Sequence, residues 1–200
     1  MRTKTEQKRL QLLSAATEVF FEQGYERTLM SHVSERAKCS KGTLYSYFES
    51  KEELYYEVII AATAQETGGV LEQLDASAEC IENLLFAFGV RLLQTVYSSR
   101  FQALRRLVFS TPADSKLGAT IYARTVKPYM DLTTQFLASA MERGQLRRDD
   151  PEVAAAHLCG LLESELLLKF LLHALDNVPP TQLESIARRA MKAFVAAYQA

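Results

Sequence analysis

The sequence lacks tryptophan and has only 8 glycines and 5 prolines among its 200 residues. Glycine and proline supply most tight turns, so their scarcity argues against a turn-rich β-sandwich or barrel. Alanine, leucine, glutamate and arginine, which favour helices, are abundant instead. Because 48% of the residues are apolar and 24% are charged, the chain can bury a substantial core. We therefore predict an all-α globular protein.

Cysteine is also scarce, with Cys39, Cys80 and Cys159 scattered along the chain. Their number is odd and no two form a CxxC pair, which argues against a disulfide scaffold and a zinc finger. The sequence also lacks a GxSxG elbow, a Walker loop and a Rossmann glycine pattern. We therefore predict no metal, no cofactor and no enzymatic activity.

Long apolar runs are missing too. The apolar stretch from Leu166 to Leu172 is interrupted by Lys169, and the N-terminus has no apolar signal core. We therefore expect a cytoplasmic protein that does not enter a membrane. The net charge of −1 hides an asymmetry, because residues 1–51 carry nine basic and six acidic side chains while residues 52–200 carry 14 and 18. The first quarter of the chain is the basic end.

Hydrophobic periodicity and capping residues predict a succession of helices. Ser40 and Asp150 are expected N-caps, Thr28 another, and Ser50 and Thr181 begin expected capping boxes. Gly24 and Gly144 follow expected helix ends, and Gly68-Gly69 weakens or kinks another. Pro112 and Pro128 set breaks, although Pro128 is also compatible with a kink. The expected helices cover residues 6–23, 28–37, 41–47, 51–67, 78–97, 100–110, 113–125, 126–143, 151–175 and 182–198.

Three short helices within the first 50 residues have the layout of a helix-turn-helix. The second helix of such a pair must be short, braced from behind, and faced with polar side chains that fit the major groove of DNA. Leu44 and Phe48 lie four residues apart and are expected to point to the core. Gly42 lets the backbone approach a phosphate, and the side chains left available are those of Lys41, Thr43, Ser46 and Tyr47.

The run CSKGTLYSYFESKEELY, from Cys39 to Tyr55, follows a helix that ends Phe20-x-x-x-Gly24 and then Thr28. In these positions the chain resembles the TetR family of bacterial transcriptional regulators over residues 8–60. The stretch from Gln102 to Ala155 is similar to the C-terminal domain of AefR-type and AcrR-type members. One departure lies in the turn, where Lys38 stands at the family's usual glycine. If that turn requires positive φ, Lys38 bears a conformational cost of roughly 1 kcal/mol.

The resemblance implies a three-helix DNA-binding domain with a helix-turn-helix, residues 1–50, and a C-terminal helical bundle for ligand binding and dimerisation, residues 51–200. It also implies that Tyr45 and Tyr47 contact phosphates and that Lys51 meets the DNA backbone, whereas Lys41, Thr43 and Ser46 are better placed for base edges. The full set implied to face double-stranded DNA is Thr28, Ser31, Lys41, Gly42, Thr43, Tyr45, Ser46, Tyr47 and Lys51.

The expected helix over residues 151–175 is apolar around most of its circumference. Such a helix must be covered on two sides, and a second copy of the chain is the natural cover for one of them. We therefore expect a homodimer formed by residues 151–175 and 182–198, which requires a palindromic operator. Glu165, Lys169 and His173 fall at four-residue steps and are expected to form one stripe, either ion-paired or contacting a ligand.

Aromatic residues recur on the helices expected to form the inner domain. The family's inner domain commonly contains a pocket for small hydrophobic compounds, so the resemblance implies a small hydrophobic effector that releases the operator. The expected pocket residues are Tyr97, Phe101, Arg105, Phe109, Tyr122, Tyr129, His157 and Glu165. Two alternatives stay open, namely a DNA-binding regulator without a small-molecule effector, and a helical small-molecule-binding protein with an incidental basic end.

Overall fold

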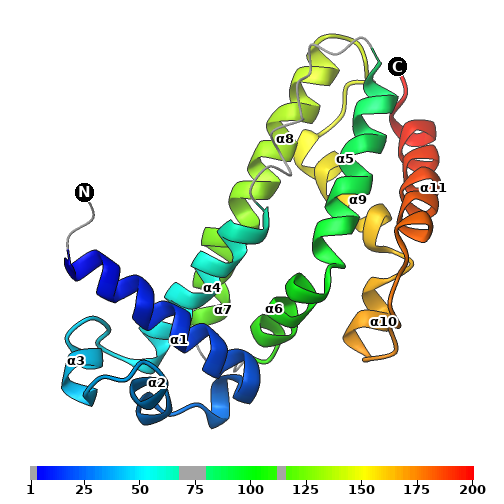
Figure 1. Ribbon diagram of the computed structural model, residues 1–200. Coiled ribbons are helices and arrows are strands. Elements are labelled where there is room, and N and C mark those ends of the chain that lie inside the picture. Colours follow the sequence, from blue (N-terminus) through cyan, green and yellow to red (C-terminus); the bar gives the residue numbers. More distant parts are fainter. Residues whose placement is uncertain (1–3, 68–79, 112–115) are drawn as a thin grey trace. The chain divides into compact units, whose positions relative to one another are not determined.

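The computed structural model describes residues 4–67, 80–111 and 116–200, and every regular element in these three ranges is a helix (Figure 1). The all-α prediction is therefore confirmed. The chain folds as two compact units, the first formed by Met1–Glu66 with Ser99–Thr125 and the second by Thr67–Ser98 with Val126–Ala200. Gly68-Gly69 and Pro112 lie outside the described residues.

The first unit contains the expected helix-turn-helix and continues beyond it. Its helices are α1 (Lys4–Arg27), α2 (Met30–Arg36), α3 (Lys41–Tyr45), α4 (Lys51–Thr67), α6 (Ser99–Phe109), α7 (Leu117–Ile121) and the π-helical turn η1 (Tyr122–Val126). Gly24 interrupts α1 with φ 77° and ψ 170°, a conformation that suits glycine and sets the end of the straight helix. The predicted stop at Gly24 is confirmed.

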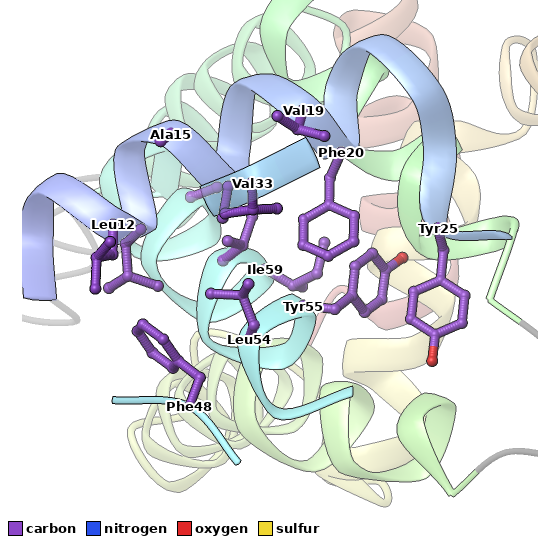
Figure 2. Close-up of a cluster of buried hydrophobic side chains, with 14 of the residues drawn as sticks. Leu12, Ala15, Val19, Phe20, Tyr25, Val33, Phe48, Leu54, Tyr55 and Ile59 are labelled. Atoms are coloured by element: carbon purple, nitrogen blue, oxygen red, sulfur yellow. The ribbon is translucent and has the colours of Figure 1, made fainter. Parts of the chain in front are cut away.

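One apolar core holds the first unit together, and it draws residues from α1, α2, α3, α4, α6 and α7. At one end of this core Tyr55 lies edge-on to both Phe20 and Tyr25, with ring centroids 5.1 and 4.7 Å apart (Figure 2). The Tyr55 hydroxyl donates a hydrogen bond to the carbonyl of Leu107 at 2.7 Å. Helix α6 is thereby fixed to the helix-turn-helix as part of the same packed body.

The second unit is a bundle in which α11 packs on α5 and α9, and α9 packs on α8. Its helices are α5 (Ile81–Val96), α8 (Lys127–Glu142), α9 (Pro151–Glu163), α10 (Leu167–Leu171) and α11 (Pro180–Tyr198). Asp150 caps α9 as predicted, because its carboxylate accepts from the backbone N–H groups of Glu152 and Val153. Pro128 lies in the first turn of α8, and Gly144, with φ 71°, follows its end.

Three expectations about these elements are wrong. The helix expected over residues 151–175 is two helices, α9 and α10, separated at Ser164–Leu166. The helix expected over 113–125 is replaced, in its described part, by the short α7 and the turn η1. Thr181 does not cap α11, which begins one residue earlier at Pro180 with Pro179 as its N-cap. In each case a local sequence signal was overridden by packing or by the adjoining proline.

The expected stripe of Glu165, Lys169 and His173 is also absent, because Glu165 precedes α10 and His173 has φ 55°. Glu165 instead accepts hydrogen bonds from the guanidinium of Arg189 on α11 at 2.8 and 2.7 Å. The two compact units also divide the chain differently from the expected functional division at residue 50, since α4, α6 and α7 belong with the helix-turn-helix. The assignment of DNA binding to residues 1–50 and of effector binding and dimerisation to residues 51–200 stays a prediction.

Candidate nucleic-acid interface

The turn between α2 and α3 has the geometry of a helix-turn-helix. Lys38 adopts φ 50°, so the turn does require positive φ and Lys38 bears the cost of roughly 1 kcal/mol considered for that case. The backbone N–H of Cys39 donates to the carbonyl of Ser34 at 3.0 Å, and the Cys39 side chain packs against the core. These contacts hold the turn against its own strain.

Helix α3 begins at the predicted cap. The Ser40 hydroxyl accepts from the backbone N–H of Thr43 at 3.0 Å. Leu44 and Phe48 are completely buried, so the brace predicted from their spacing is confirmed. Lys41, Gly42, Tyr45 and Ser46 are exposed on the opposite face, and Thr43 is half-buried beside them. The chain thus presents a short polar helix on a rigid apolar support.

The hydroxyls on α3 have internal partners that limit how they can bind a base. Ser46 donates its hydroxyl proton to the carbonyl of Thr43 at 2.7 Å, which leaves its oxygen as an acceptor. The Thr43 and Ser40 hydroxyls share a hydrogen bond at 2.9 Å. Only one of these two hydroxyls donates to the other, so the pair retains one proton for an outside acceptor. A base edge would therefore meet both donor and acceptor groups on this helix.

Helix α2 contributes less than expected. Thr28 is completely buried and donates its hydroxyl to the carbonyl of Gly24 at 2.7 Å, so its side chain is not available to DNA. It does not cap α2 either, because the N-cap is Leu29. Ser31 is half-buried on α2 and remains a candidate contact. His32 approaches the Leu29 backbone N–H at 3.4 Å and the Gln23 amide oxygen at 2.8 Å, which gives it a role at the start of the helix.

Lys51, expected to meet the DNA backbone, is held within the protein. Its ammonium donates to the carbonyl of Tyr25 at 3.1 Å and lies 4.2 Å from the centre of the Tyr25 ring. The Tyr25 hydroxyl in turn donates to the Glu52 carboxylate at 2.9 Å. Burial, followed by this hydrogen bond, raises the pKa of Tyr25 well above its usual range. Lys51 therefore joins the end of α1 to the start of α4, a role that its position in the sequence did not reveal.

The two tyrosines of the YSY segment differ in exposure. Tyr45 is 49% exposed, whereas Tyr47 is half-buried against the apolar core. Each of the two tyrosines has a hydroxyl that suits a phosphate contact at the edge of the interface. Tyr45 has the freer side chain, so it is the better of the two for a substitution that leaves the fold intact.

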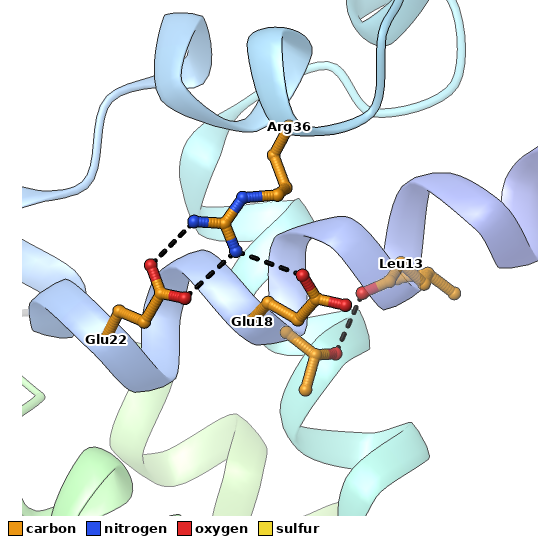
Figure 3. A network of polar contacts seen from close by, with 5 residues as sticks. Leu13, Glu18, Glu22 and Arg36 are labelled. Carbon is orange, nitrogen blue, oxygen red and sulfur yellow. Dashed lines mark hydrogen bonds and ion pairs between the residues drawn. The ribbon is translucent and has the colours of Figure 1, made fainter.

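An ion-pair bracket joins α2 to α1 on the far side of this turn. The Arg36 guanidinium donates to both oxygens of Glu22, at 3.0 and 2.7 Å, and to Glu18 at 3.0 Å (Figure 3). Hydrogen bonding to Arg36 holds the pKa of Glu22 below its usual range. All three side chains are substantially exposed, so solvent and salt screen the attraction. The bracket orients α2 without contributing much to stability.

The eight expected effector-binding residues divide between the two units. Phe101, Arg105, Phe109 and Tyr122 belong to the first, where Phe109 and Tyr122 are 58% and 54% exposed. In the second unit His157 hydrogen-bonds the Tyr198 hydroxyl at 2.7 Å, and Glu165 pairs with Arg189 on the surface.

Tyr97 and Tyr129, also in the second unit, both interact with Glu163. The Tyr97 hydroxyl donates to the Glu163 carboxylate at 3.1 Å, and the pKa of Tyr129 is raised mainly by burial, with Cys159 and then the charge of Glu163 adding to the shift. Glu163 and Cys159, one helical turn apart on α9, were missed from the sequence. The i, i+4 spacing was visible, but their inward orientation was not.

No set of three or more His, Cys, Asp or Glu side chains in the described ranges is arranged to hold a metal ion. Within the same ranges, no helix combines the length and the apolar character needed to cross a membrane.

Both parts of the chain match family models. Residues 12–58 match the model described as bacterial regulatory proteins of the tetR family, and residues 83–200 match the C-terminal domain of AefR-like transcriptional repressors. The transcriptional regulator UidR of Escherichia coli K12 is 27% identical over 193 residues, which cover 95% of this chain and 89% of UidR.

Solved structures match over nearly the whole length. A TetR-family transcriptional regulator from Mesorhizobium loti MAFF303099 superimposes with a TM-score of 0.89 at 27% identity and covers 100% of both chains. The flavonoid-responsive regulator FrrA gives a TM-score of 0.79 at 28% identity, covering 96% of this chain and 97% of its own. The helix order described above is thus shared with regulators along its entire length.

Proposed function

The chain belongs to the TetR family of bacterial transcriptional regulators, and from this premise we propose that it is a dimeric repressor released from its operator by a small hydrophobic effector. The observation that carries the proposal is the construction of α3, a short polar helix braced by the fully buried Leu44 and Phe48. A helix of this kind fits the major groove and leaves base-reading side chains outward. The protein would act in the cytoplasm as a regulator and not as an enzyme.

The proposed DNA contacts fall into two kinds. Lys41, Thr43 and Ser46 would reach base edges, because their side chains lie on the outward side of α3. Phosphates would be met by the Tyr45 and Tyr47 hydroxyls, the backbone at Gly42, Ser31 and, beside its bond to Tyr25, Lys51. Thr28 is left out of the revised set because it is buried.

The second unit offers a surface suited to a two-fold dimer. Helices α9 and α11 are neighbours, and each exposes small side chains on one face that allow close approach. On α9 these are Ala156 and Gly160, and on α11 Ser185 and Ala193. Nearby α10 leaves Leu168 66% exposed and the following Leu172 68% exposed. Covering such apolar side chains with a second copy would remove them from water and present two α3 helices to a palindromic operator.

The dimer is testable with a matched pair of variants. Leu168→Glu should dissociate it and weaken operator binding together, because the charge would have to be buried against the partner. Leu132→Glu places the same charge on α8, at a leucine that is 49% exposed, and should leave the mass unchanged. Light scattering at micromolar concentration gives the mass. A one-chain mass for the unmodified protein would contradict the proposal.

The hydrophobic effector is supported by the neighbour FrrA, a flavonoid-responsive regulator that shares 28% identity across nearly the full chain. Such an effector would act by preferring the conformer in which the two α3 helices no longer match the operator. A coupling of about 1–3 kcal/mol gives roughly a 5–150-fold loss of operator affinity. We propose that the effector binds within the C-terminal residues 51–200.

DNA binding itself is tested by selecting sequences from random duplexes and measuring affinity by fluorescence anisotropy. We expect a two-fold symmetric motif and binding that weakens steeply with salt. The double variant Lys41→Ala, Tyr45→Ala should weaken binding overall, because it removes a positive charge and a phosphate contact, and should relax the preference at the base that Lys41 contacts. Lys116→Ala, another exposed lysine of the first unit, serves as the control. If the double variant bound as tightly as the unmodified chain at moderate salt, the interface would be assigned wrongly.

A further inference from the structure

Four polar side chains from three helices meet inside the second unit. Tyr97 lies at the end of α5, Tyr129 lies in the first turn of α8, and Cys159 and Glu163 lie one turn apart on α9. We call these four residues the inner polar cluster. Tyr129, Cys159 and Glu163 are half-buried as whole residues, so the cluster lies at an edge of the core.

Hydrogen bonding within the inner polar cluster is incomplete. Tyr97 donates its hydroxyl to Glu163 at 3.1 Å. The Tyr129 hydroxyl oxygen is buried, yet no described residue offers it a hydrogen-bond partner of acceptable geometry. The neighbouring Thr133 donates its hydroxyl to the Tyr129 carbonyl at 3.0 Å, and its oxygen lies outside hydrogen-bonding geometry for the Tyr129 hydroxyl. A buried hydroxyl without a partner is uncommon in folded proteins and indicates a place for water or a ligand.

The protonation states in the cluster define what that ligand must offer. Burial, followed by the neighbouring Cys159, raises the pKa of Tyr129 far above its usual range, so this side chain stays a neutral donor. Burial raises the pKa of the Cys159 thiol to about 11, so it is neither a thiolate nor a good nucleophile. Glu163 is the acceptor of the cluster. A ligand group must therefore accept a hydrogen bond from Tyr129 and tolerate, or donate to, the carboxylate of Glu163.

A single hydroxyl group meets both requirements, because it can accept from Tyr129 and donate to Glu163. A carboxylate could accept from Tyr129 but would be repelled by Glu163, and an ammonium could donate to Glu163 but could not accept from Tyr129. The rings of Phe88 and Tyr129 lie nearly parallel with centroids 6.2 Å apart. Phe88 is buried, so the Tyr129 ring has an apolar aromatic neighbour beside the hydroxyl site.

We propose that the inner polar cluster recognises the hydroxyl of a neutral phenolic effector. The inference rests on the proposed function for its regulatory meaning, but the binding itself can be measured without DNA. It replaces most of the effector residues expected from the sequence and retains Tyr97 and Tyr129.

The test uses matched ligands and calorimetric titration of the full chain. The first set is 4-hydroxybiphenyl, 4-methoxybiphenyl and biphenyl-4-carboxylate, and the second is 2-naphthol, 2-methoxynaphthalene and 2-naphthoate. In at least one set the phenol should bind at least about tenfold more tightly than its methyl ether and its carboxylate, because only the phenol can both accept and donate. A preference for the carboxylate, or no binding by either phenol, would overturn the proposal.

Two variants separate recognition from a merely structural role. Tyr129→Phe should lower the affinity for the phenol about tenfold. In the same ligand set, the ratio of methyl-ether affinity to carboxylate affinity should change less. Glu163→Gln removes the negative charge and should improve carboxylate binding relative to phenol binding. Tyr122→Phe, at an exposed tyrosine of the first unit, is the control and should change neither. An unchanged phenol-to-carboxylate ratio in Glu163→Gln would contradict the assignment.

Operator affinity, measured on the same preparations without ligand, keeps the two proposals apart. If the chain binds its selected operator but no phenol, the effector class is wrong and DNA binding stands. If it binds the phenol with the expected variant pattern but no duplex DNA, the proposed function is wrong and the ligand site stands.

Discussion

Tyr55 in the first unit and Tyr129 in the second are both tyrosines whose pKa is raised mainly by burial, but their hydroxyls have different surroundings. Tyr55 donates to the Leu107 carbonyl at 2.7 Å and lies 3.1 Å from the Thr111 hydroxyl. Tyr129 has no partner among the described residues. In the first unit the hydrogen bonds of the Tyr55 hydroxyl join α4 to the segment formed by α6 and Thr111. In the second unit the Tyr129 hydroxyl remains available to a ligand.

The difference indicates that the first unit is built for rigidity and the second for a response to a ligand. The first unit must hold α3 in a fixed position, and Tyr25, Lys51 and Arg36 make internal contacts that do so. The second unit keeps the Tyr129 hydroxyl buried near Cys159 without a hydrogen bond of acceptable geometry, which lowers stability but provides a site for differential binding. The predictions below test whether this contrast holds, starting with the largest expected effect.

Phe48→Ala should remove the brace behind α3. Phe48 is completely buried in the core of the first unit, so truncation should lower the free energy of unfolding by about 3–5 kcal/mol. Phe109→Ala, at a phenylalanine of the same unit that is 58% exposed, should change it by less than about 1 kcal/mol. Urea denaturation followed by circular dichroism compares the two. Equal losses would show that the first unit is not held by this core.

Tyr55→Phe and Tyr129→Phe test the contrast directly, because each removes one hydroxyl oxygen. Loss of the Tyr55 hydroxyl removes one donor to the Leu107 carbonyl, which keeps its hydrogen bonds from Ser110, and should destabilise the protein by about 1 kcal/mol. Loss of the Tyr129 hydroxyl should cost nothing and can raise stability by up to about 1 kcal/mol, since a buried unpaired group disappears. Thermal and urea unfolding without ligand measure both. A marked destabilisation by Tyr129→Phe would mean that this hydroxyl has a structural partner.

Lys51→Ala and Lys41→Ala should separate stability from DNA binding. Lys51 donates to the Tyr25 carbonyl and lies over its ring, so its removal should cost about 1 kcal/mol of stability and also weaken operator binding. Lys41 is exposed, so its removal should weaken binding and reduce the salt slope by about one without affecting stability. Denaturation and salt-dependent anisotropy distinguish these outcomes. Identical stabilities would show that the Lys51 contact contributes nothing.

Arg36→Gln should have the smallest effect, and its sign follows from the pKa of Glu22. Arg36 depresses that pKa in the folded state, so the pair stabilises the protein above the ordinary glutamate pKa of 4.5 and loses this contribution as pH falls through the lower folded value. The difference between the variant and the unmodified chain should therefore be small at neutral pH, shrink with added salt and vanish in acid. A difference that grew as pH fell would contradict the bracket.

Local signals in the sequence were sufficient for the helix-turn-helix. Ser40 caps α3, Leu44 and Phe48 face inward at a four-residue spacing, and Lys38 takes the positive φ that its place in the turn implied. These features depend on residues within ten positions of one another, so the sequence alone was enough to predict them. Thr28 shows the limit, because a residue type that favours caps is buried here by the packing of α2 on α1.

Contacts between distant residues could not be predicted. Glu165 and Arg189 are 24 positions apart, and their ion pair depends on a break after Glu163 that no glycine or proline marks. The inner polar cluster requires the packing of three helices, and for that reason the expected effector set contained Glu165 and His157 but omitted Glu163 and Cys159. The Lys51 contact with Tyr25 was missed for the same reason, since it spans 26 positions.

The account's central claim is that two copies of α3 read bases in a symmetric operator. The most direct test is to repeat the selection from random duplexes with Thr43→Asn, because asparagine pairs with adenine in the major groove and Thr43 lies on the outward half of α3. We predict a motif that changes at the same position in both half-sites while the rest of it is retained. Selection of an unchanged motif, or of none by the unmodified chain, would contradict the claim.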